Sequence, residues 1–472
     1  MASPPVATIC VTVPDPVRRP LARYGLGEAA ARLGIRLRLV EGEPQDGQIV
    51  YGPVPDNWRG ATLAYDPRCY DATVRFAALG RPPRWAPEGA GLESVDLVGG
   101  LARLLTLADE AQVDERARNA NGIFRNAALP PARARVEAVP LVEHHVAALG
   151  QRLRAIAPGL PPLGRPRWPG GRRLAVLLTH DTDAVALGAP MEIVFNAAKA
   201  VVRADRVRAR MAWAGLTLKG EDPLFGFGKW AALERAAALR SAFFLFGRGC
   251  VRPTLNDCRS SVFGRAVDWD LLRALADDGW EFGLHSPIRA KFELAEFQWG
   301  KQAVEQRIGQ PVHGLRHHYW SIDWRQPHLT FRKHVSAGFR YDSSMAWRDT
   351  AGFRAGTCLP YRPFDPERQR ALALYELPTT LMDAHVLADG GDPEAAVRRV
   401  LELADAIRRV GGMLVLDWHT EAAAGAFCYR NVPAVLAAVI EALRGDSETW
   451  FATPWAAARH WEERCRALDT DA

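Results

Sequence analysis

The stretch Leu174–Asp183, LAVLLTHDTD, determines how the rest of the chain is interpreted. Its first five residues form an unbroken apolar run, and the sequence Pro-Gly-Gly at 169–171 stands shortly before it. A short apolar run next to turn-forming residues is typical of a strand buried on both faces. Two carboxylates, Asp181 and Asp183, follow at the end of this strand together with His180. They indicate either an ordinary turn rich in Asp and Thr or one edge of an active site.

Composition limits the class of protein. The chain has 472 residues, of which 48% are hydrophobic and 24% charged, as in globular proteins with two or three domains. The net charge is +6, but only six of the 60 basic residues are Lys, and the Arg residues are scattered among Asp and Glu. This distribution argues against a nucleic-acid-binding surface and leaves a modest preference for anionic substrates open.

Cysteine usage and hydropathy bear on the compartment. The seven Cys form no CxxC pair, which argues against a disulfide framework and a structural zinc site. Residues 1–13 show no basic segment followed by an apolar stretch of signal-peptide length, and no uncharged apolar run reaches about 20 residues. We therefore expect a cytoplasmic protein without a transmembrane helix.

The first third of the chain is expected to form a separate α/β domain, residues 1–156. Short apolar segments predict strands at 7–13, 35–40, 48–51 and 62–65, and amphipathic spacing predicts helices at 21–34, 94–110 and 139–156. Residues 157–173, rich in Pro and Gly, cannot continue a helix or a central strand and are interpreted as a linker.

The remainder, residues 174–472, alternates apolar runs with helical patterns. The runs are 174–178, 242–246, 281–284, 314–318, 339–341, 371–377, 413–418 and 450–453, and the helices between them include 230–239, 268–278, 292–309, 393–410 and 432–444. About eight strand–helix repeats predict a parallel sheet closed into a barrel. Residues 184–228 exceed an ordinary connection, so we expect an inserted helical excursion there, in the position of a lid.

Polar residues gather after four of these runs, where a parallel barrel carries its functional groups. The first run is followed by Asp181 and Asp183, the third by His285, and the seventh by His419. The fourth run contributes Arg316, His317, His318 and Tyr319. Carboxylates and imidazoles with one open position are what a catalytic zinc or similar divalent ion requires. A second carboxylate and a further His would then serve as base and acid.

Four of these segments resemble, in order, the motifs of the polysaccharide deacetylase superfamily, the NodB-homology carbohydrate esterases. THDTD at 179–183 resembles the first motif, GLHS at 283–286 the second, LRHHY at 315–319 the third and LDWH at 416–419 the last. The N-terminal α/β unit and GFRAGTCLPYRPFD at 352–365 are similar to one bacterial subgroup of this superfamily. The resemblance implies an α/β fold: a distorted (β/α) barrel of NodB-homology type with a smaller N-terminal α/β domain.

The resemblance also implies roles. Asp181 becomes the general base, Asp183 and His285 metal ligands, and His419 the general acid. Arg316 would hold Asp181 ionised through a bidentate pair. Tyr319, by its side chain or backbone N–H, would face the developing oxyanion.

One position departs from the family pattern. Arg289 stands where the second motif carries another His, and Arg cannot bind a metal ion. We favour His318 as the replacement ligand, with His317 as the lesser candidate; weak metal binding and loss of catalysis are the alternatives. Asp383 and Glu376 are candidates for supporting contacts. Cys358 is interpreted as a buried small residue rather than a nucleophile.

The expected function follows from these roles. The chain is predicted to be a hydrolase that depends on a divalent metal ion, with zinc as the expected cofactor. It would remove an N-acyl group, expected to be acetyl, from an amino sugar in a saccharide or an intracellular precursor. The alternatives are a hydrolase of a small non-sugar amide and a catalytically inactive binding or scaffold protein of polysaccharide assembly.

Overall fold

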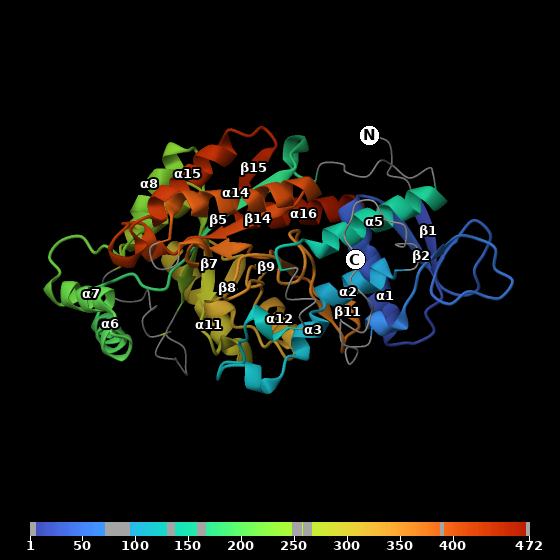
Figure 1. Cartoon of the computed structure of the whole chain (residues 1–472), viewed down its shortest axis with the longest axis horizontal. Coiled ribbons are helices and arrows are strands. Elements are labelled where there is room, and N and C mark those ends of the chain that lie inside the picture. Colours follow the sequence, from blue (N-terminus) through green and yellow to red (C-terminus); the bar gives the residue numbers. More distant parts are fainter. Residues whose placement is uncertain are drawn as a thin grey trace.

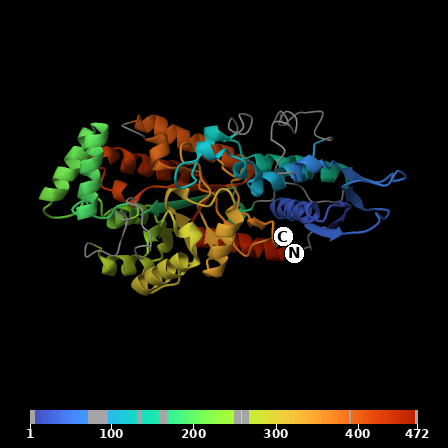
Figure 2. The same cartoon turned by 90° about the horizontal axis from the view of Figure 1, so that it is seen from below.

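The computed structural model describes residues 6–70, 95–129, 137–157, 167–247, 257, 267–387 and 391–468. Residues 158–166, the greater part of the linker expected at 157–173, lie outside these ranges. The molecule is elongated (Figure 1). An N-terminal α/β unit lies at one end, the barrel occupies the middle, and the helices α6 and α7 project at the other end, as the second view also shows (Figure 2).

The N-terminal unit is built on a four-stranded sheet in the order β2-β1-β3-β4, and all its pairs are parallel. The strands are β1 (Val6–Val11), β2 (Arg36–Val40), β3 (Ile49–Tyr51) and β4 (Thr62–Leu63). The helices are α1 (Arg18–Leu33), α2 (Leu97–Leu105), α3 (Ala108–Ala111) and α5 (Leu141–Ile156). The single helix expected at 94–110 is two helices, because Leu107 has a φ of 58° and this left-handed conformation interrupts the helix.

A second, larger sheet carries the rest of the molecule. Its order is β12-β9-β8-β7-β6-β5-β14-β13, β15 pairs with β5 beside it, and every pair is parallel. The central strands are β5 (Leu174–Asp181), β6 (Ala242–Phe246), β7 (Glu281–Ser286), β8 (Gly314–His317) and β14 (Met413–Asp417). The shorter ones are β9 (Tyr341–Asp342), β12 (Tyr375–Glu376), β13 (Leu381–Met382) and β15 (Thr449–Ala452).

The two ends of this sheet lie near each other. β12 and β13 stand at opposite ends of the strand order, yet only residues 377–380 separate them in sequence. Five residue steps span at most about 18 Å, so the sheet must curl until its edges approach. The Arg316 guanidinium on β8 donates to Thr379 Oγ1 in this connection at 3.0 Å. The fold is therefore the distorted (β/α) barrel expected from the sequence.

The strand expected at 371–377 is wrong in detail. Its beginning belongs to β11 (Arg370–Ala371), which forms a small antiparallel hairpin with β10 (Phe364–Asp365) outside the barrel. Only Tyr375–Glu376 joins the barrel sheet, beside β9. Both halves of the segment 371–377 are apolar because both are packed. Hydrophobicity alone therefore does not reveal that the two halves pair with different strands. β13 was not predicted at all.

Helices cover the outside of the barrel (Figure 1). They are α8 (Phe227–Ala236), α10 (Trp269–Asp277), α11 (Leu294–Ile308), α12 (Pro327–Ser336), α13 (Asp383–Val386), α14 (Pro393–Val410), α15 (Val432–Arg444) and α16 (Pro454–Ala467). The excursion expected at 184–228 contains a helical hairpin, α6 (Pro190–Arg203) and α7 (Arg206–Thr217). Within the described ranges, no helix has the length and apolarity needed to cross a bilayer.

The N-terminal unit contacts the barrel domain through buried polar groups. Glu143 on α5 accepts hydrogen bonds from Thr357 Oγ1 at 2.5 Å and from the Cys358 backbone N–H at 3.3 Å, and it lies 3.6 Å from Arg32 on α1. Tyr24 on α1 donates to the Arg362 carbonyl at 2.8 Å. Thr357 and Arg362 lie in the segment 352–365, which the sequence analysis singled out. This segment therefore joins the two parts of the molecule.

Candidate active site

At the end of β5, successive side chains point to opposite faces of the sheet, as in any strand. Thr179 and Asp181 both contact the Arg316 guanidinium, at 2.8 and 2.9 Å. His180 between them turns to the helical shell, where it stacks on Trp230 and its Nε2 lies 2.8 Å from Glu234 Oε1. His180 is thus part of the packing between sheet and helices, although it stands inside the first motif.

Three potential metal-binding side chains converge beyond the strand ends. Asp183, His285 and His318 each offer one ligand atom within 4.8 Å of the others. Oδ1 of Asp183 lies 3.2 Å from His285 Nε2 and 3.4 Å from His318 Nε2. A tetrahedral zinc with ligands at about 2.0–2.1 Å has edges of about 3.3–3.4 Å between ligand atoms. The two distances from Asp183 fit such an ion, and the two imidazole ligand atoms lie within 4.8 Å of each other.

In both imidazoles, the ring nitrogen that faces away from Asp183 has a partner of its own. His285 Nδ1 lies 3.1 Å from the Arg316 carbonyl oxygen, which can only accept, so Nδ1 carries the proton and Nε2 is left as the ligand atom. His318 Nδ1 lies 3.1 Å from Asp257 Oδ1. A carboxylate or carbonyl behind a ligating His is the usual support of zinc sites. The donor set and its supporting contacts both fit a divalent ion.

The field at this cluster favours positive charge. Burial would lower the pKa of His318, but Asp183 and Asp257 outweigh it and raise that pKa to about 9. Burial would likewise raise the pKa of Asp183, yet His318 and His285 hold it well below its usual range. Carboxylates that hold a proton on His318 would attract a cation in the same place.

The Asp181–Arg316 contact differs from the bidentate pair predicted. Only Nη1 of Arg316 reaches Asp181, at 2.9 Å, because Nε donates to the Ser343 carbonyl and Nη2 to Ser343 Oγ and Thr379. Asp417 on β14 shares the same guanidinium at 3.3 Å and accepts from the Asp181 backbone N–H at 3.2 Å. Burial and the neighbouring Asp181 raise the pKa of Asp417 well above its usual range, which favours the neutral form of Asp417.

His419 forms a pair with Asp383. Its Nδ1 lies 3.0 Å from Asp383 Oδ1, and its backbone N–H donates to Oδ2 at 3.0 Å. Burial opposes protonation of His419, but Asp383 and Asp417 raise its pKa well above the usual range. His419 is therefore held as an imidazolium, the form that can donate a proton. Asp383 has the supporting contact that the sequence analysis considered for it.

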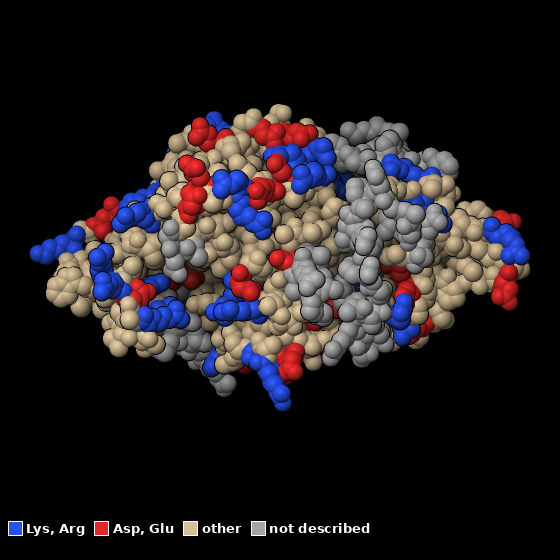
Figure 3. Space-filling view, in the orientation of Figure 1, with Lys and Arg blue, Asp and Glu red and all other residues tan. Residues whose placement is uncertain are grey.

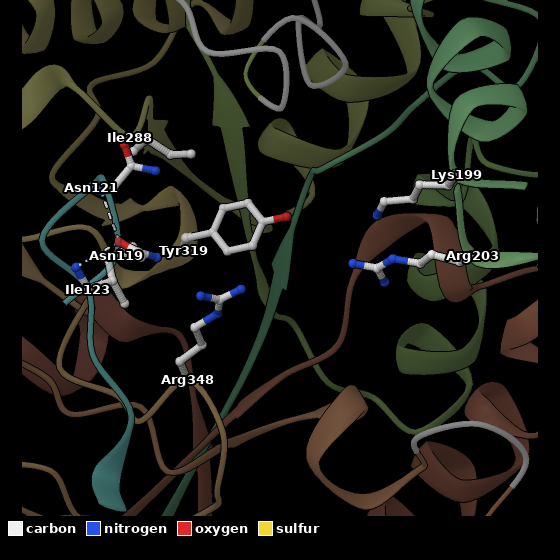
Figure 4. A pocket seen from close by; sticks show the side chains of 8 residues that line it. All are labelled: Asn119, Asn121, Ile123, Lys199, Arg203, Ile288, Tyr319 and Arg348. Atoms are coloured by element: carbon white, nitrogen blue, oxygen red, sulfur yellow. Dashed lines mark hydrogen bonds between the residues drawn. The ribbon is translucent and has the colours of Figure 1, made fainter. Parts of the chain in front are cut away.

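These groups line one cleft of about 250 Å³, which also contains Tyr319, Trp320, Lys199, Arg208 and Arg348. A second hollow of about 270 Å³ adjoins it and shares Lys199, Tyr319 and Arg348. Figure 4 shows the Tyr319 hydroxyl directed toward Lys199 and Arg203 of α6, with Arg348 close to the ring. Tyr319 and Trp320 have φ angles of 57° and 53°, a strained conformation that often marks functional sites.

Several sequence candidates lie elsewhere. His317 points away from the cluster, with its Nε2 2.9 Å from His334 Nε2 in the buried shell. Arg289 is exposed and is not among the residues that line the cleft. Glu376 is buried and bonds to the Met345 backbone N–H at 2.9 Å. Cys358 is buried against Glu143, and burial raises the pKa of its thiol, as suits a packing residue.

Three features of the site were not recognised in the sequence. Asp417 stands two residues before His419 in a motif already quoted, so the period of a strand could have placed it at the site. Asp257 has no such signal, because no motif or strand end marks it. The cationic wall combines Lys199 and Arg208 of the α6–α7 hairpin with Arg348 from a segment distant in sequence, so only the fold reveals it.

No protein-family model and no curated protein matches the chain. Solved structures do match. The chain is similar to a candidate polysaccharide deacetylase from Mycobacterium smegmatis, with 20% identity over 64% of this chain and 95% of that one and a TM-score of 0.44. It is also similar to one from Pseudomonas aeruginosa PAO1, with 18% identity over 65% of this chain and 95% of that one and a TM-score of 0.42. A third match is Puue allantoinase, with 17% identity over 65% of this chain and 95% of that one and a TM-score of 0.41.

Proposed function

We propose that the chain is a metal-dependent hydrolase that removes an N-acyl group, acetyl above all, from an amino sugar of a saccharide or its precursor. One observation carries the proposal. A potential three-ligand metal site, a carboxylate held by a buried Arg and an imidazolium held by a buried Asp all line a single cleft. Metal-dependent amide hydrolysis uses a metal ion, a general base and a general acid together.

The metal site would consist of Asp183, His285 and His318. A divalent ion such as zinc would supply Lewis-acid chemistry and make water more acidic. The spacing of the three ligand atoms supports this assignment, as do the contacts of both imidazoles on the far side. With His318 in this position, the exposed Arg289 no longer argues for an inactive scaffold protein.

The remaining residues would move the protons. Asp181, which accepts a hydrogen bond from Arg316, would take a proton from the attacking water. His419, kept protonated by Asp383, would give a proton to the leaving amine. The Tyr319 region would face the oxygen on which negative charge develops, since Tyr319 directly follows the ligand His318.

The cationic side of the cleft, which Glu421 also lines in part, favours a substrate with a negative charge. Lys199, Arg208 and Arg348 line it, and Arg203 joins them in the adjoining hollow (Figure 4). A saccharide that carries a phosphate or carboxylate would place this anionic group among these cations. The small volume of the cleft, about 250 Å³, also suits a second candidate function, the hydrolysis of a small non-sugar amide.

Acetate release tests the proposal directly. Protein purified without chelator would be analysed for bound metal and then assayed on N-acetylated amino-sugar oligosaccharides, on sugar phosphates and on small non-sugar amides. We expect one divalent ion per chain and acetate release that chelation abolishes and zinc restores. Stoichiometric metal with turnover of non-sugar amides only would favour the second candidate. Neither metal nor turnover would contradict the proposal.

A further inference from the structure

In the hairpin formed by α6 and α7, the polar face of α6 points into the molecule and apolar side chains point to solvent. On α6 the polar residues Glu192, Asn196, Lys199 and Arg203 follow at intervals of four, three and four, so they share one face. Glu192 and Asn196 are buried, and Asn196 Nδ2 donates to Glu192 Oε1 at 2.7 Å. Lys199 and Arg203 line the hollows beside the candidate active site. The polar face is thus turned inward.

The apolar face is turned outward. Six of the eleven exposed large apolar side chains among the described residues lie on this hairpin: Met191, Val194, Val201, Val202, Trp213 and Leu216. Val201 and Val202 are each 83% exposed and Trp213 is 69% exposed. Such a concentration on one projecting element indicates a surface that something else covers.

The charges of the hairpin indicate what covers it. From Pro190 to Thr217 it carries five basic and two acidic residues. Both acidic residues are engaged: Glu192 is buried, and Asp205 caps α7 by accepting from the backbone N–H groups of residues 207 and 208. Arg206 and Arg210 are exposed, one turn apart, on the helix that presents Trp213. In Figure 3, basic side chains stand at this end of the molecule among residues that carry no charge.

We propose that the α6–α7 hairpin, residues 190–217, docks onto a membrane surface that contains anionic lipid. Apolar side chains with Trp on one face, Arg close by and no outward acidic group are the composition of helices that lie in the interface of a bilayer. Docking of this kind does not require a helix that spans the membrane.

Vesicle sedimentation tests this inference without any assay of activity. The full chain would be mixed with vesicles of phosphatidylcholine alone or of phosphatidylcholine with phosphatidylglycerol, at low and at high salt. We expect binding to the anionic vesicles that 0.5 M NaCl weakens, because salt screens the contribution of Arg. Absence of binding to the anionic vesicles would overturn the proposal.

Substitutions locate the surface. Val201→Glu and, separately, Trp213→Glu should lower the partition coefficient about tenfold each, since each removes an inserted apolar side chain. Trp299→Glu is the matched control, because Trp299 is also exposed but lies on α11, away from the hairpin. Equal loss in the control and the hairpin variants would contradict the assignment.

A second copy of the chain is the competing occupant. Sedimentation velocity over a concentration series separates the two, and circular dichroism checks that each variant is folded. A monomer that binds anionic vesicles supports the membrane. A dimer that Val201→Glu dissociates, without vesicle binding by the wild type, would assign the face to self-association and overturn the proposal.

Discussion

Nε2 of His318 lies 3.4 Å from Oδ1 of Asp183, although the two residues follow strands β8 and β5. Two further strands, β6 and β7, stand between these in the sheet, and β7 supplies His285 to the same oxygen at 3.2 Å. The curvature of the sheet brings the three ends together. This relationship gives the candidate metal site a third protein ligand without any contribution from residue 289.

Loss of one ligand should abolish metal binding. We expect His318→Ala, Asp183→Ala and His285→Ala each to purify with far less than one metal ion per chain, because two protein groups rarely hold a divalent ion. Elemental analysis of the purified proteins measures this. Arg289→Ala is the control and should keep the full metal content, since Arg289 is exposed and outside the cleft. Full metal content in all three ligand variants would contradict the assignment.

Asp181→Asn should keep the metal and lose turnover by about 10²–10⁴-fold, the usual contribution of a positioned base. Asp417→Asn is the matched control. The pKa of Asp417 is raised well above its usual range by burial and Asp181, so an amide resembles the neutral acid already present. We expect this variant to keep most of the activity. Comparable losses in both variants, measured as kcat, would assign the base to the pair rather than to Asp181.

The Asp383–His419 pair predicts a change in pH dependence. Burial lowers the pKa of His419, but Asp383 raises it well above the usual range overall. A general acid is active below its pKa, so the wild type should stay active on the alkaline side of neutrality. Removal of the negative charge by Asp383→Asn lowers that pKa, and the alkaline limb of kcat should move to lower pH. An unchanged limb in a pH profile would show that another group donates the proton.

The fold was predictable where a segment is long and regular. The central strands and the long helices, such as β5 and α14, match the sequence expectation because an unbroken apolar run or a wide apolar face has one plausible partner surface. Prediction failed at 371–377, where two strands of two residues each belong to different sheets. Such short pairings are set by tertiary contacts, which no local pattern records.

The candidate site was predictable to the extent that strand ends define it. Asp181 and His285 lie at the ends of strands, Asp183, His318 and His419 follow strands, and parallel strands bring their ends to one edge. The geometry of Arg316 was not predictable, because the partners of Nε and Nη2, Ser343 and Thr379, come from segments without a motif. Asp257 behind His318 was missed for the same reason.

The cationic wall of the cleft predicts selectivity for charge. Arg348→Ala should raise KM for a phosphorylated N-acetyl sugar about tenfold and leave KM for the neutral sugar unchanged, because a charge-assisted hydrogen bond is lost only with the anionic substrate. Arg210→Ala is the control, an exposed Arg of α7 outside the cleft. Steady-state kinetics on the two sugars measures both constants. Equal effects on both sugars would indicate a role unrelated to charge.

The boundary between the two parts of the chain can be tested by limited proteolysis. We expect cleavage within or near residues 157–173, because this Pro- and Gly-rich sequence suits neither helix nor strand. Its last residues are the exception. Trp168 is buried and its Nε1 donates to the Gly412 carbonyl at 2.9 Å, so cuts should fall before it. Two stable fragments should result, and resistance here with cleavage elsewhere would contradict the boundary.

The fragments should nevertheless stay together in gel filtration, since α1 and α5 contact the segment 352–365 through buried groups. Glu143→Ala would leave the Thr357 hydroxyl and the Cys358 N–H without their buried acceptor, at a cost of about 1–3 kcal/mol, while Arg32 keeps its pair with Glu28. In this variant the cleaved fragments should separate. Glu41→Ala removes an exposed partner of Arg19 and should cost less than about 1 kcal/mol. Separation in the Glu41 variant as well would show that the buried charges do not hold the two parts together.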